Sequence, residues 1–386
     1  MESIDVEKAV RERYSQGAAK PQAALCCPVE YDPRYLDVIP REVLERDYGC
    51  GDPTRDIRPG EQVLDLGSGT GKVCFIAGQI AGADGRVIGI DTNSEMLALA
   101  RRCAPQVSAK IGYANVDFRR GKIEDLTTDL DAVDEWLRRN PIHDADGLER
   151  LSGFIAEQRR AAPLVADDSI DVVVSNCVLN LVRESSKRQV FQEIYRVLKR
   201  GGRAVISDIV SDEPVPEHLR NDPELWSGCV SGALEQGAFL EAFEQAGFHG
   251  IEILKRDAQP WRTVEGIEFR SITVRAMKGK QGPCWDCNQA VIYRGPWRKV
   301  EDDDGHILVR GQPMAVCEKT FRIYTSEPYA GAIIPVLPLA PVPLEQAKSF
   351  DCSRDSIRDP RETKGVEYRS TTDINGACCG PEGCCN

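Results

Sequence analysis

The sequence predicts an α/β protein whose largest part is a doubly wound sheet of about seven strands. After Pro59-Gly60, short apolar runs alternate with stretches of helical periodicity, which is typical of parallel strands joined by crossover helices. A glycine-rich loop follows the first apolar run, and such a loop lets a ligand approach the backbone. From about Gly282 the pattern changes to short alternating runs, which predicts a small β-rich domain.

Residues 1–58 are predicted to form a helical segment that precedes the sheet. Apolar residues recur at roughly helical spacing over 6–13 and 35–47, with charged residues on the opposite side. The first eight residues are charged and lack the apolar region of a signal peptide. We therefore expect a cytoplasmic protein whose thiols stay reduced.

The sheet is expected within residues 59–279, where strands and helices can be assigned in order. Apolar runs predict strands at 62–66, 86–91, 116–120, 170–175, 203–209, 250–256 and 269–276. Helical spacing predicts helices that include 72–80, 94–103, 188–198 and 237–246.

Three further segments lie outside this alternation. Residues 125–166 are highly charged, with interspersed Leu, Val and Ile, and this pattern predicts an inserted helical hairpin. Because the insertion lies in a loop, we expect it to leave the ligand-binding site described below intact. The predicted β-rich domain occupies residues 280–350, with strands at 290–293, 306–310 and 320–324. Residues 351–386 are polar, end in a cysteine cluster, and predict a disordered tail.

Composition excludes several classes of protein. The net charge is −12 and no run of Lys or Arg is dense enough for a nucleic-acid backbone. The longest apolar stretch, 330–344, is short and interrupted by four prolines, so no membrane span is expected. Fifteen cysteines among 386 residues are too few for a disulfide scaffold. We expect these thiols to be available for metal, redox or nucleophilic chemistry.

The glycine loop at 67–72 is the clearest local motif. A P-loop would need Ser or Thr where this chain has Val73, and a dinucleotide fingerprint would need Gly where it has Lys72. The remaining form, Asp65 followed by three alternating glycines and by Asp91 at the end of the next strand, resembles S-adenosylmethionine-dependent methyltransferases of the Rossmann-like class I fold. Two carboxylate oxygens at Asp91 suit the vicinal diol of a ribose.

The resemblance implies where S-adenosylmethionine binds. In that family an acidic position after the third strand hydrogen-bonds the adenine, and here it is Glu124. The implied cofactor-binding residues are Asp65, Gly67, Ser68, Gly69, Gly71, Asp91, Thr92, Ile123, Glu124 and Asn176.

The acceptor position, at the carboxyl end of the fourth predicted strand, carries a thiol, Cys177, in the motif SNCVLNL. Together with YGCG at 48–51 and LWSGCVSGAL at 225–234, this motif resembles the arsenite S-adenosylmethionine methyltransferase family over about residues 14–278. The resemblance implies that Cys50, Cys177 and Cys229 bind trivalent arsenic.

It also implies a further N-terminal thiol in a disulfide relay, which falls on Cys26 or Cys27. The spacing to Cys50 leaves open which of the two takes part. Thioredoxin or glutathione would be the reductant, and arsenite or its thiol conjugates the substrate, methylated to mono- and dimethyl products in arsenic detoxification.

The chemistry is consistent with this resemblance. Trivalent arsenic is soft and pyramidal, so three thiolates suit it, and its lone pair is already a nucleophile. Methyl transfer then needs alignment more than a general base. Two alternatives remain open: a soft-metal sequestration protein, and a methyltransferase of a small organic acceptor.

The other cysteines receive different interpretations. Cys74 and Cys103 lie on predicted helices and are expected to pack in the core. Cys284 and Cys287 form one CxxC pair, a weak indication of a zinc site with Cys317 and His306. Cys352 is unassigned. The terminal thiols could chelate a soft ion, and they are Cys378, Cys379, Cys384 and Cys385.

Overall fold

A computed structural model describes residues 6–20, 29–46, 48–353 and 356–369 of the chain. The chain divides into two compact units, Met1–Gly279 and Lys280–Asn386, which are considered separately. Cys26, Cys27 and the four terminal cysteines lie outside the described residues. Within the described ranges, no helix is long and apolar enough to cross a membrane.

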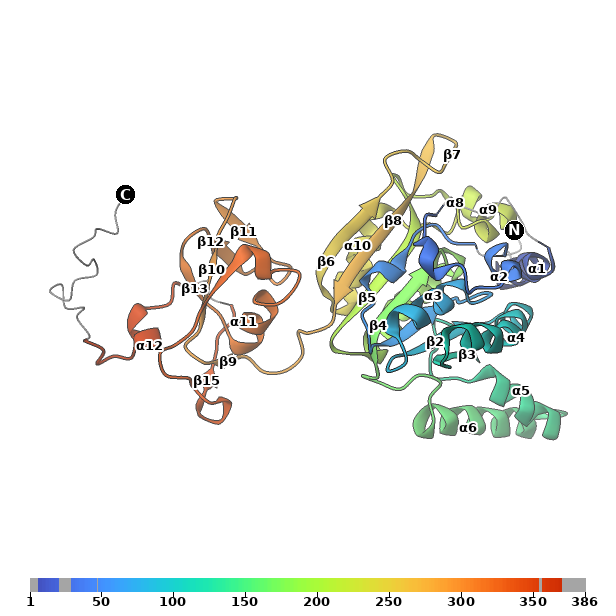
Figure 1. The fold of residues 1–386 in the computed structure, drawn as a ribbon, viewed down its shortest axis with the longest axis horizontal. Helices are drawn as coiled ribbons and strands as arrows, with labels where there is room; N and C mark the ends of the chain where they lie inside the picture. The colour runs from blue at the N-terminus through green and yellow to red at the C-terminus, as the bar shows by residue number, and fades with distance from the viewer. Residues whose placement is uncertain (1–5, 21–28, 47, 354–355, 370–386) are drawn as a thin grey trace. The chain divides into compact units, whose positions relative to one another are not determined.

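The first unit is built on one mixed sheet (Figure 1). Along the sheet its strands are β3 (Val116–Arg120), β2 (Arg86–Asp91), β1 (Gln62–Leu66), β4 (Ile170–Asn176), β5 (Leu198–Ser211), β8 (Ile267–Met277) and β6 (His249–Arg256). The first five are parallel, and the last two add antiparallel pairings. All seven predicted strands are confirmed. The short β7 (Arg262–Val264), which pairs with β8, was not predicted because three residues carry no readable periodicity.

Helices cover both faces of this sheet, as a doubly wound fold requires. Alternate residues of β1 point to opposite faces. Leu64 and Leu66 belong to the same core cluster as residues of α7 (Glu184–Val197) and α10 (Gln236–Ala246). Val63 belongs to a second cluster, with α3 (Lys72–Ala81) and α4 (Ser94–Ile111).

Helix α4 is longer than the predicted 94–103. It passes through Pro105 and ends at Gly112, whose φ of 88° closes the helix. Pro105 is exposed, while Cys103 and Val107 on either side of it are buried. The apolar face therefore continues past the proline, and packing outweighs the lost backbone hydrogen bond.

The N-terminal segment is less helical than its periodicity predicts. It contains α1 (Val6–Ala19), and its shorter helices are η2 (Pro33–Tyr35), α2 (Arg41–Leu44) and η3 (Pro53–Asp56). The helix predicted over 35–47 is wrong, because Pro40 disfavours helical geometry in the residue before it and lies at the N-cap of α2.

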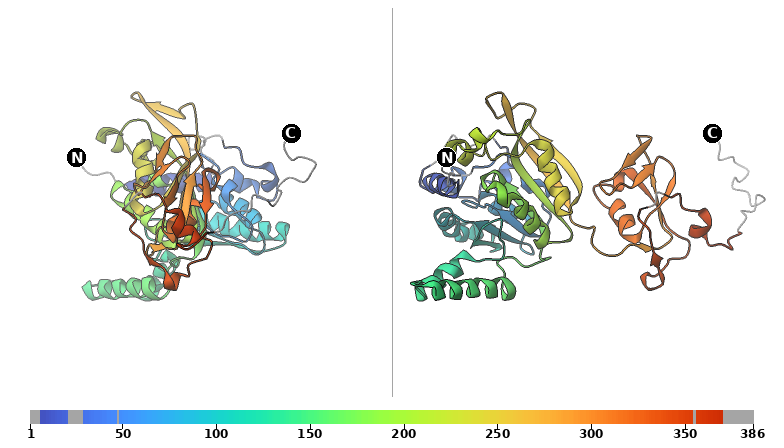
Figure 2. Two further views of the ribbon diagram at one scale, coloured as in Figure 1. Left: turned by 90° about the vertical axis from the view of Figure 1, so that its left-hand side faces the viewer. Right: turned by 180° about the vertical axis from the view of Figure 1, so that it is seen from behind.

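The insertion forms the predicted helical hairpin. Its helices, α5 (Leu130–Arg139) and α6 (Ala145–Ala161), are joined by a short loop and project beyond the β3 edge of the sheet (Figures 1 and 2). The rings of Trp136 and Phe154 stack between them, with centroids 5.6 Å apart.

Shorter elements complete the first unit after β4 and β5. They are η4 (Leu179–Leu181), α8 (Glu217–Arg220) and α9 (Pro223–Ser227).

The second unit consists of short strands and two short helices. Its three-stranded sheet contains β13 (Pro313–Ala315), β10 (Ala290–Tyr293) and β14 (Ile333–Val336) in that order. Two further sheets have two strands each. One pairs β11 (Lys299–Glu301) with β12 (Ile307–Val309), and the other pairs β15 (Lys348–Ser349) with β9 (Trp285–Asp286). The remaining elements are α11 (Glu318–Tyr324), η5 (Ala330–Ala332), η6 (Leu344–Gln346) and α12 (Pro360–Lys364).

Two predictions for this unit are wrong. The strand predicted at 320–324 is part of α11, because Phe321 and Tyr324 are buried at helical rather than alternating spacing and Cys317 caps the helix. The segment from 351 is not wholly a disordered tail. Ile357 pairs with Met314, Arg358 is buried, and α12 follows. Long-range pairing orders this polar segment, which composition alone does not reveal.

Candidate active site

A cavity of about 310 Å³ opens at the carboxyl ends of β1, β2 and β4. This is the edge at which open α/β sheets bind ligands, and the volume lies at the lower end of the range for small-molecule pockets. Of the ten residues predicted to bind the cofactor, all but Gly71 line it: Asp65, Gly67, Ser68, Gly69, Asp91, Thr92, Ile123, Glu124 and Asn176.

The glycine loop forms one wall of the cavity. Gly67 and Gly69 have φ values of 68° and 51°, which favour glycine. A Cβ on Gly71 would lie 2.5 Å from the Phe118 ring, so Gly71 serves loop packing rather than the cavity surface. Ser68 Oγ is buried and has no hydrogen-bond partner among the described residues, as expected of a hydroxyl that meets a ligand.

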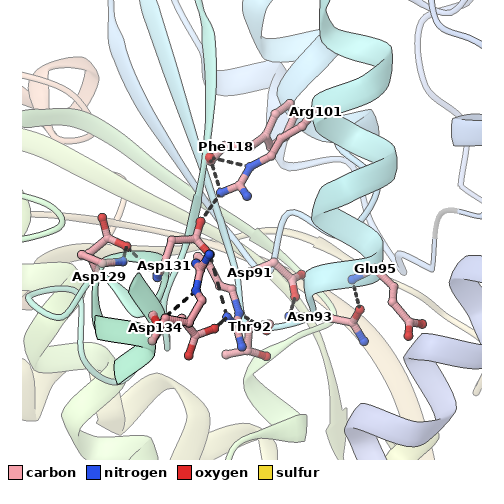
Figure 3. A network of polar contacts seen from close by, with 12 residues as sticks. Asp91, Thr92, Asn93, Glu95, Arg101, Phe118, Asp129, Asp131 and Asp134 are labelled. Atoms are coloured by element: carbon pink, nitrogen blue, oxygen red, sulfur yellow. Dashed lines mark hydrogen bonds and ion pairs between the residues drawn. The ribbon is translucent and has the colours of Figure 1, made fainter. Parts of the chain in front are cut away.

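Asp91 is held by the backbone around it (Figure 3). Its two carboxylate oxygens accept hydrogen bonds from the amides of Gly69, at 2.8 Å, and Asn93, at 2.7 Å. Burial raises the pKa of Asp91, although these amides act in the opposite direction. Each oxygen retains a further lone pair for a hydroxyl, so the residues present fit a ribose diol.

The inserted hairpin contributes to the wall of the cavity, which stays intact beside it. Leu130, at the start of α5, lines the cavity, as does Arg120 at the end of β3. Arg120 pairs with Asp134 of α5, and Arg101 of α4 pairs with Asp131 at 2.7 Å (Figure 3). Ion pairs therefore attach α5 to the sheet beside the cavity.

Helix α1 lines the cavity as well, which no local pattern in the sequence indicates. Val10, Arg11 and Tyr14 face the cavity. Arg13, on the same helix, donates a 2.9 Å hydrogen bond to Ser227 Oγ of α9. This helix therefore links the cofactor cavity to the segment that carries Cys229.

Three predicted thiols, those of Cys50, Cys177 and Cys229, meet beside the cavity. All three are buried, and the Cys177 thiol contacts the thiols of the other two. Cys177 also lines the cavity, and Cys229 Sγ donates to the Cys177 carbonyl oxygen at 3.3 Å. Tyr14 Oη lies 3.7 Å from Cys229 Sγ. Segments more than 170 residues apart thus present their sulfur atoms together.

Cys177 and Cys229 adopt left-handed backbone conformations, with φ values of 62° and 60°. Such a conformation costs a non-glycine residue about 1 kcal/mol or more, and it is concentrated at functional sites. Glycine would remove the cost at either position. The fold therefore keeps cysteine at positions 177 and 229 although their backbone conformations are strained.

Asn176 supports the thiols rather than offering free polar atoms to the cavity. Its Oδ1 accepts from the amides of Cys50 and Gly51, and its Nδ2 donates to the Gly51 carbonyl oxygen and to Tyr31 Oη. These four bonds use the hydrogen-bonding capacity of the amide. A Cβ on Gly49 would lie 2.2 Å from Asn176 Nδ2, so this loop requires glycine there.

The thiols of Cys50 and Cys177 are protonated in the protein alone. Burial raises the pKa of Cys50, and hydrogen bonding to Cys229 and Cys50, together with burial, raises that of Cys177 well above the usual value. Burial, followed by the charges of Cys229 and Cys177, raises the pKa of Tyr14. A soft ion that binds here must therefore displace protons.

Asp208, in β5, was missed by sequence reasoning. It is fully buried, and its carboxylate accepts from the amides of Leu179 and Ile209, both at 2.8 Å. Burial raises its pKa to about 6. A polar Ser207-Asp208 pair within an apolar strand is the signal that would have identified it.

The two helix cysteines differ in detail from simple packing residues. Cys74 is buried and donates to the Asp65 carboxylate at 3.1 Å, so it orients an acid that lines the cavity. Cys103 is buried and donates to Glu42 at 3.3 Å.

Two family models match the chain. A methyltransferase domain matches residues 57–151 and 147–247. A domain of unknown function, DUF8838, matches residues 280–368. The two matches fall on either side of the division between the compact units.

Known proteins extend this similarity across both units. An arsenite methyltransferase from Aquipseudomonas alcaligenes is 32% identical over 331 residues, covering 82% of this chain and 85% of the relative. That of Homo sapiens is 29% identical over 373 residues, covering 91% and 88%. A solved arsenic(III) S-adenosylmethionine methyltransferase from Chlamydomonas reinhardtii has a TM-score of 0.54 and 27% identity, covering 84% of this chain and 100% of that one. The chain therefore belongs to the arsenite methyltransferase family and is a methyltransferase enzyme.

Proposed function

We propose that the chain methylates trivalent arsenic, with S-adenosylmethionine as the methyl donor and Cys50, Cys177 and Cys229 as the arsenic ligands. The observation that carries this proposal is the position of Cys177, whose thiol contacts both other thiols and lines the cavity formed by the glycine loop and Asp91. The proposed site for the methyl donor and the proposed arsenic site are therefore adjacent at Cys177.

Ligand exchange can load the site without a separate base. When arsenite arrives as a trithiol conjugate, each protein thiol replaces one thiol ligand and transfers its proton to the departing sulfur. The raised pKa values of Cys50 and Cys177 then present no obstacle, because no free thiolate must accumulate. Three sulfur atoms complete the pyramidal coordination that trivalent arsenic prefers.

The chain's residues then act by alignment. Asp91 and the glycine loop hold the cofactor, Asn176 fixes the Cys50 loop, and the strained backbone fixes Cys177 and Cys229. When bound, S-adenosylmethionine supplies an electrophilic methyl group on a sulfonium. The arsenic lone pair forms the new As–C bond as the S–C bond breaks, and arsenic loses two electrons formally.

Reduction must restore trivalent arsenic after each transfer. We assign the two electrons to a thiol pair among Cys26 or Cys27, Cys50 and Cys177, which becomes a disulfide and is renewed by thioredoxin or glutathione. A cytoplasmic location and a role in arsenic detoxification accord with that reductant.

The decisive experiment measures methylated arsenic by chromatography coupled to mass spectrometry. Cys177→Ser and Cys229→Ser are expected to lower turnover at least about 100-fold, because the arsenic loses a ligand and its alignment. S-adenosylmethionine binding, measured by equilibrium dialysis, should persist and shows that each variant is folded. Cys103→Ser, at a buried thiol on α4, is the matched control and should retain turnover.

Other outcomes would contradict the proposal. Unchanged turnover in Cys177→Ser removes the thiol assignment. Arsenic retained by the unaltered chain without any methylated product favours sequestration. Methylation of an organic acceptor that survives loss of both Cys50 and Cys229 favours a small-molecule methyltransferase.

A further inference from the structure

A second group of thiols lies in the C-terminal unit. The sulfur atoms of Cys284, Cys317 and Cys352 all lie within 4.8 Å of one another. Cys317 is fully buried, and the other two are half-buried. This grouping differs from the sequence interpretation, since it includes the unassigned Cys352 and leaves out both His306 and Cys287.

These three thiols lie on three separate segments of the chain. Cys284 directly precedes β9 and Cys352 follows β15, and these two strands pair, with Ser349 opposite Trp285. The Phe350 amide extends the pairing by donating to the Cys284 carbonyl oxygen at 2.9 Å. Cys317 caps α11, where its sulfur accepts a hydrogen bond from the Thr320 amide at 3.4 Å. Backbone contacts on all three sides therefore fix the positions of the sulfur atoms.

The unit has a core that includes Val291, Tyr293 and Leu308, but the strands β9 and β15 next to Cys284 and Cys352 are only two residues long. Its sheets contain only two or three short strands, and the nine cysteines among the described residues are free thiols. A metal ion or a disulfide can join such short segments and stabilise them. A disulfide would join only two of the three sulfurs and leave the third unused, whereas a metal ion uses all of them.

A fourth thiol, that of Cys287, lies at the other end of β9 from Cys284. Cys287 is 5% exposed and follows Cys284 at CxxC spacing, which lets two cysteines of one turn bind the same zinc ion. The next residue, Asn288, has a φ of 58°, and its amide donates to Asp286 at 2.9 Å, so the turn is tightly closed. Four thiols suit tetrahedral zinc, whereas trivalent arsenic uses three.

We propose that Cys284, Cys317 and Cys352 bind a zinc ion that stabilises the C-terminal unit, with Cys287 as the fourth donor. This site is separate from the proposed arsenic ligands and does not depend on them. Zinc would link three separate segments of a unit that has no disulfide among its described residues.

The test measures zinc by mass spectrometry in the full chain after dialysis against zinc-containing and then zinc-free buffer. The four terminal cysteines are first replaced by serine, so that zinc held by Cys378, Cys379, Cys384 and Cys385 is not counted. About one zinc per chain is expected, and Cys317→Ser should reduce this about tenfold. Cys103→Ser, in the other unit, should keep its zinc.

Two further variants keep the test decisive if Cys317→Ser fails to fold. Cys352→His retains a zinc-binding nitrogen and should keep the metal, whereas Cys352→Ser should lose it. With cobalt in place of zinc, the unaltered site should show the visible bands of tetrahedral thiolate coordination. The sulfur-to-cobalt absorption should fall in Cys287→Ser.

Several results would overturn the proposal. A chain that holds no zinc after incubation, or a folded Cys317→Ser that holds as much as its parent, removes the site. An unchanged cobalt spectrum in Cys287→Ser removes the fourth donor. One arsenite bound per chain after Cys50, Cys177 and Cys229 are all replaced by serine, and lost with Cys317→Ser, would make it an arsenic site instead.

Discussion

At the residue scale, Asp208 makes the stability of the segment after Cys177 depend on pH. Its carboxylate accepts amides at the start of η4, and burial raises its pKa from 3.8 to about 6. The native state therefore binds this proton more tightly than the unfolded chain does. The contribution of Asp208 to the free energy of unfolding is largest below about pH 4 and is lost as the pH rises through 6.

We predict that this contribution falls by about 1 kcal/mol between pH 5 and pH 7.5. Urea unfolding at the two pH values measures it, and Asp208→Asn should lose this component of the pH dependence. Asp56→Asn, at a half-buried carboxylate, serves as the control. An equal change with pH in the unaltered chain and in Asp208→Asn would show that the native carboxyl titrates normally.

Asn176 provides a second prediction, which separates positioning from cofactor binding. Asn176→Ala removes four hydrogen bonds that hold the Cys50 loop, so arsenite affinity should fall about tenfold. S-adenosylmethionine affinity should change by less than about twofold, because the lost amide has no free donor or acceptor for it. Calorimetry with each ligand measures both.

Asn115→Ala is a suitable comparison, because that amide also holds backbone, donating to the carbonyl oxygens of Gly78 and Gly82 at the C-terminal end of α3. It should leave arsenite affinity unchanged. Equal losses of affinity for both ligands in Asn176→Ala would instead support the original assignment of Asn176 to the cofactor.

At the scale of elements, the inserted hairpin is attached by charges rather than by a large apolar interface. Asp131 and Asp134 of α5 pair with Arg101 and Arg120 at the edge of the sheet. Because these pairs are largely exposed, each adds less than about 1 kcal/mol to stability. These ion pairs hold α5 so that Leu130 lines the cofactor cavity.

We predict that replacing Asp131 and Asp134 together by Asn raises the KM for S-adenosylmethionine about threefold, with little change in Tm. Steady-state kinetics and thermal unfolding measure the two effects. Glu135→Gln breaks an ion pair with Arg139 inside the same helix and should change neither. A KM equal to that of the unaltered chain would show that the hairpin is only an appendage.

At the scale of the whole molecule, two units with separate cores follow one another along the chain. Arg358 anchors the segment that leads into α12 of the second unit. Its guanidinium is buried and pairs with Asp286 at 2.7 Å and Glu362 at 3.0 Å. Removal of this buried guanidinium leaves the carboxylates of Asp286 and Glu362 without a positive charge beside them.

Arg358→Ala should therefore destabilise the second unit by about 2 to 3 kcal/mol. Hydrogen exchange should accelerate in β9, β13 and α12 and stay unchanged in β1 to β4, because the units have separate cores. Arg361→Ala, at an exposed pair with Asp359, is the control. Faster exchange throughout both units would mean that they unfold as one.

Much of the first unit was predictable because its signals are local. Strands such as β1, β2 and β4 are short apolar runs, and the loop at Gly67 and Gly69 follows directly on the first of them. Where local signals conflict with long-range contacts, prediction failed. The helix expected at 35–47 and the strand expected at 320–324 both had misleading periodicity.

The sequence by itself determined the sheet, the glycine loop, the acid at Asp91 and the motifs around Cys50, Cys177 and Cys229, because spacing along the chain encodes them. Only the tertiary structure decided that Asn176 holds the Cys50 loop, that α1 and α5 line the cavity, and that Cys352 joins Cys284 and Cys317. These contacts connect distant segments. Their partners are chosen by packing and by the pairing of buried polar groups, which no local pattern specifies.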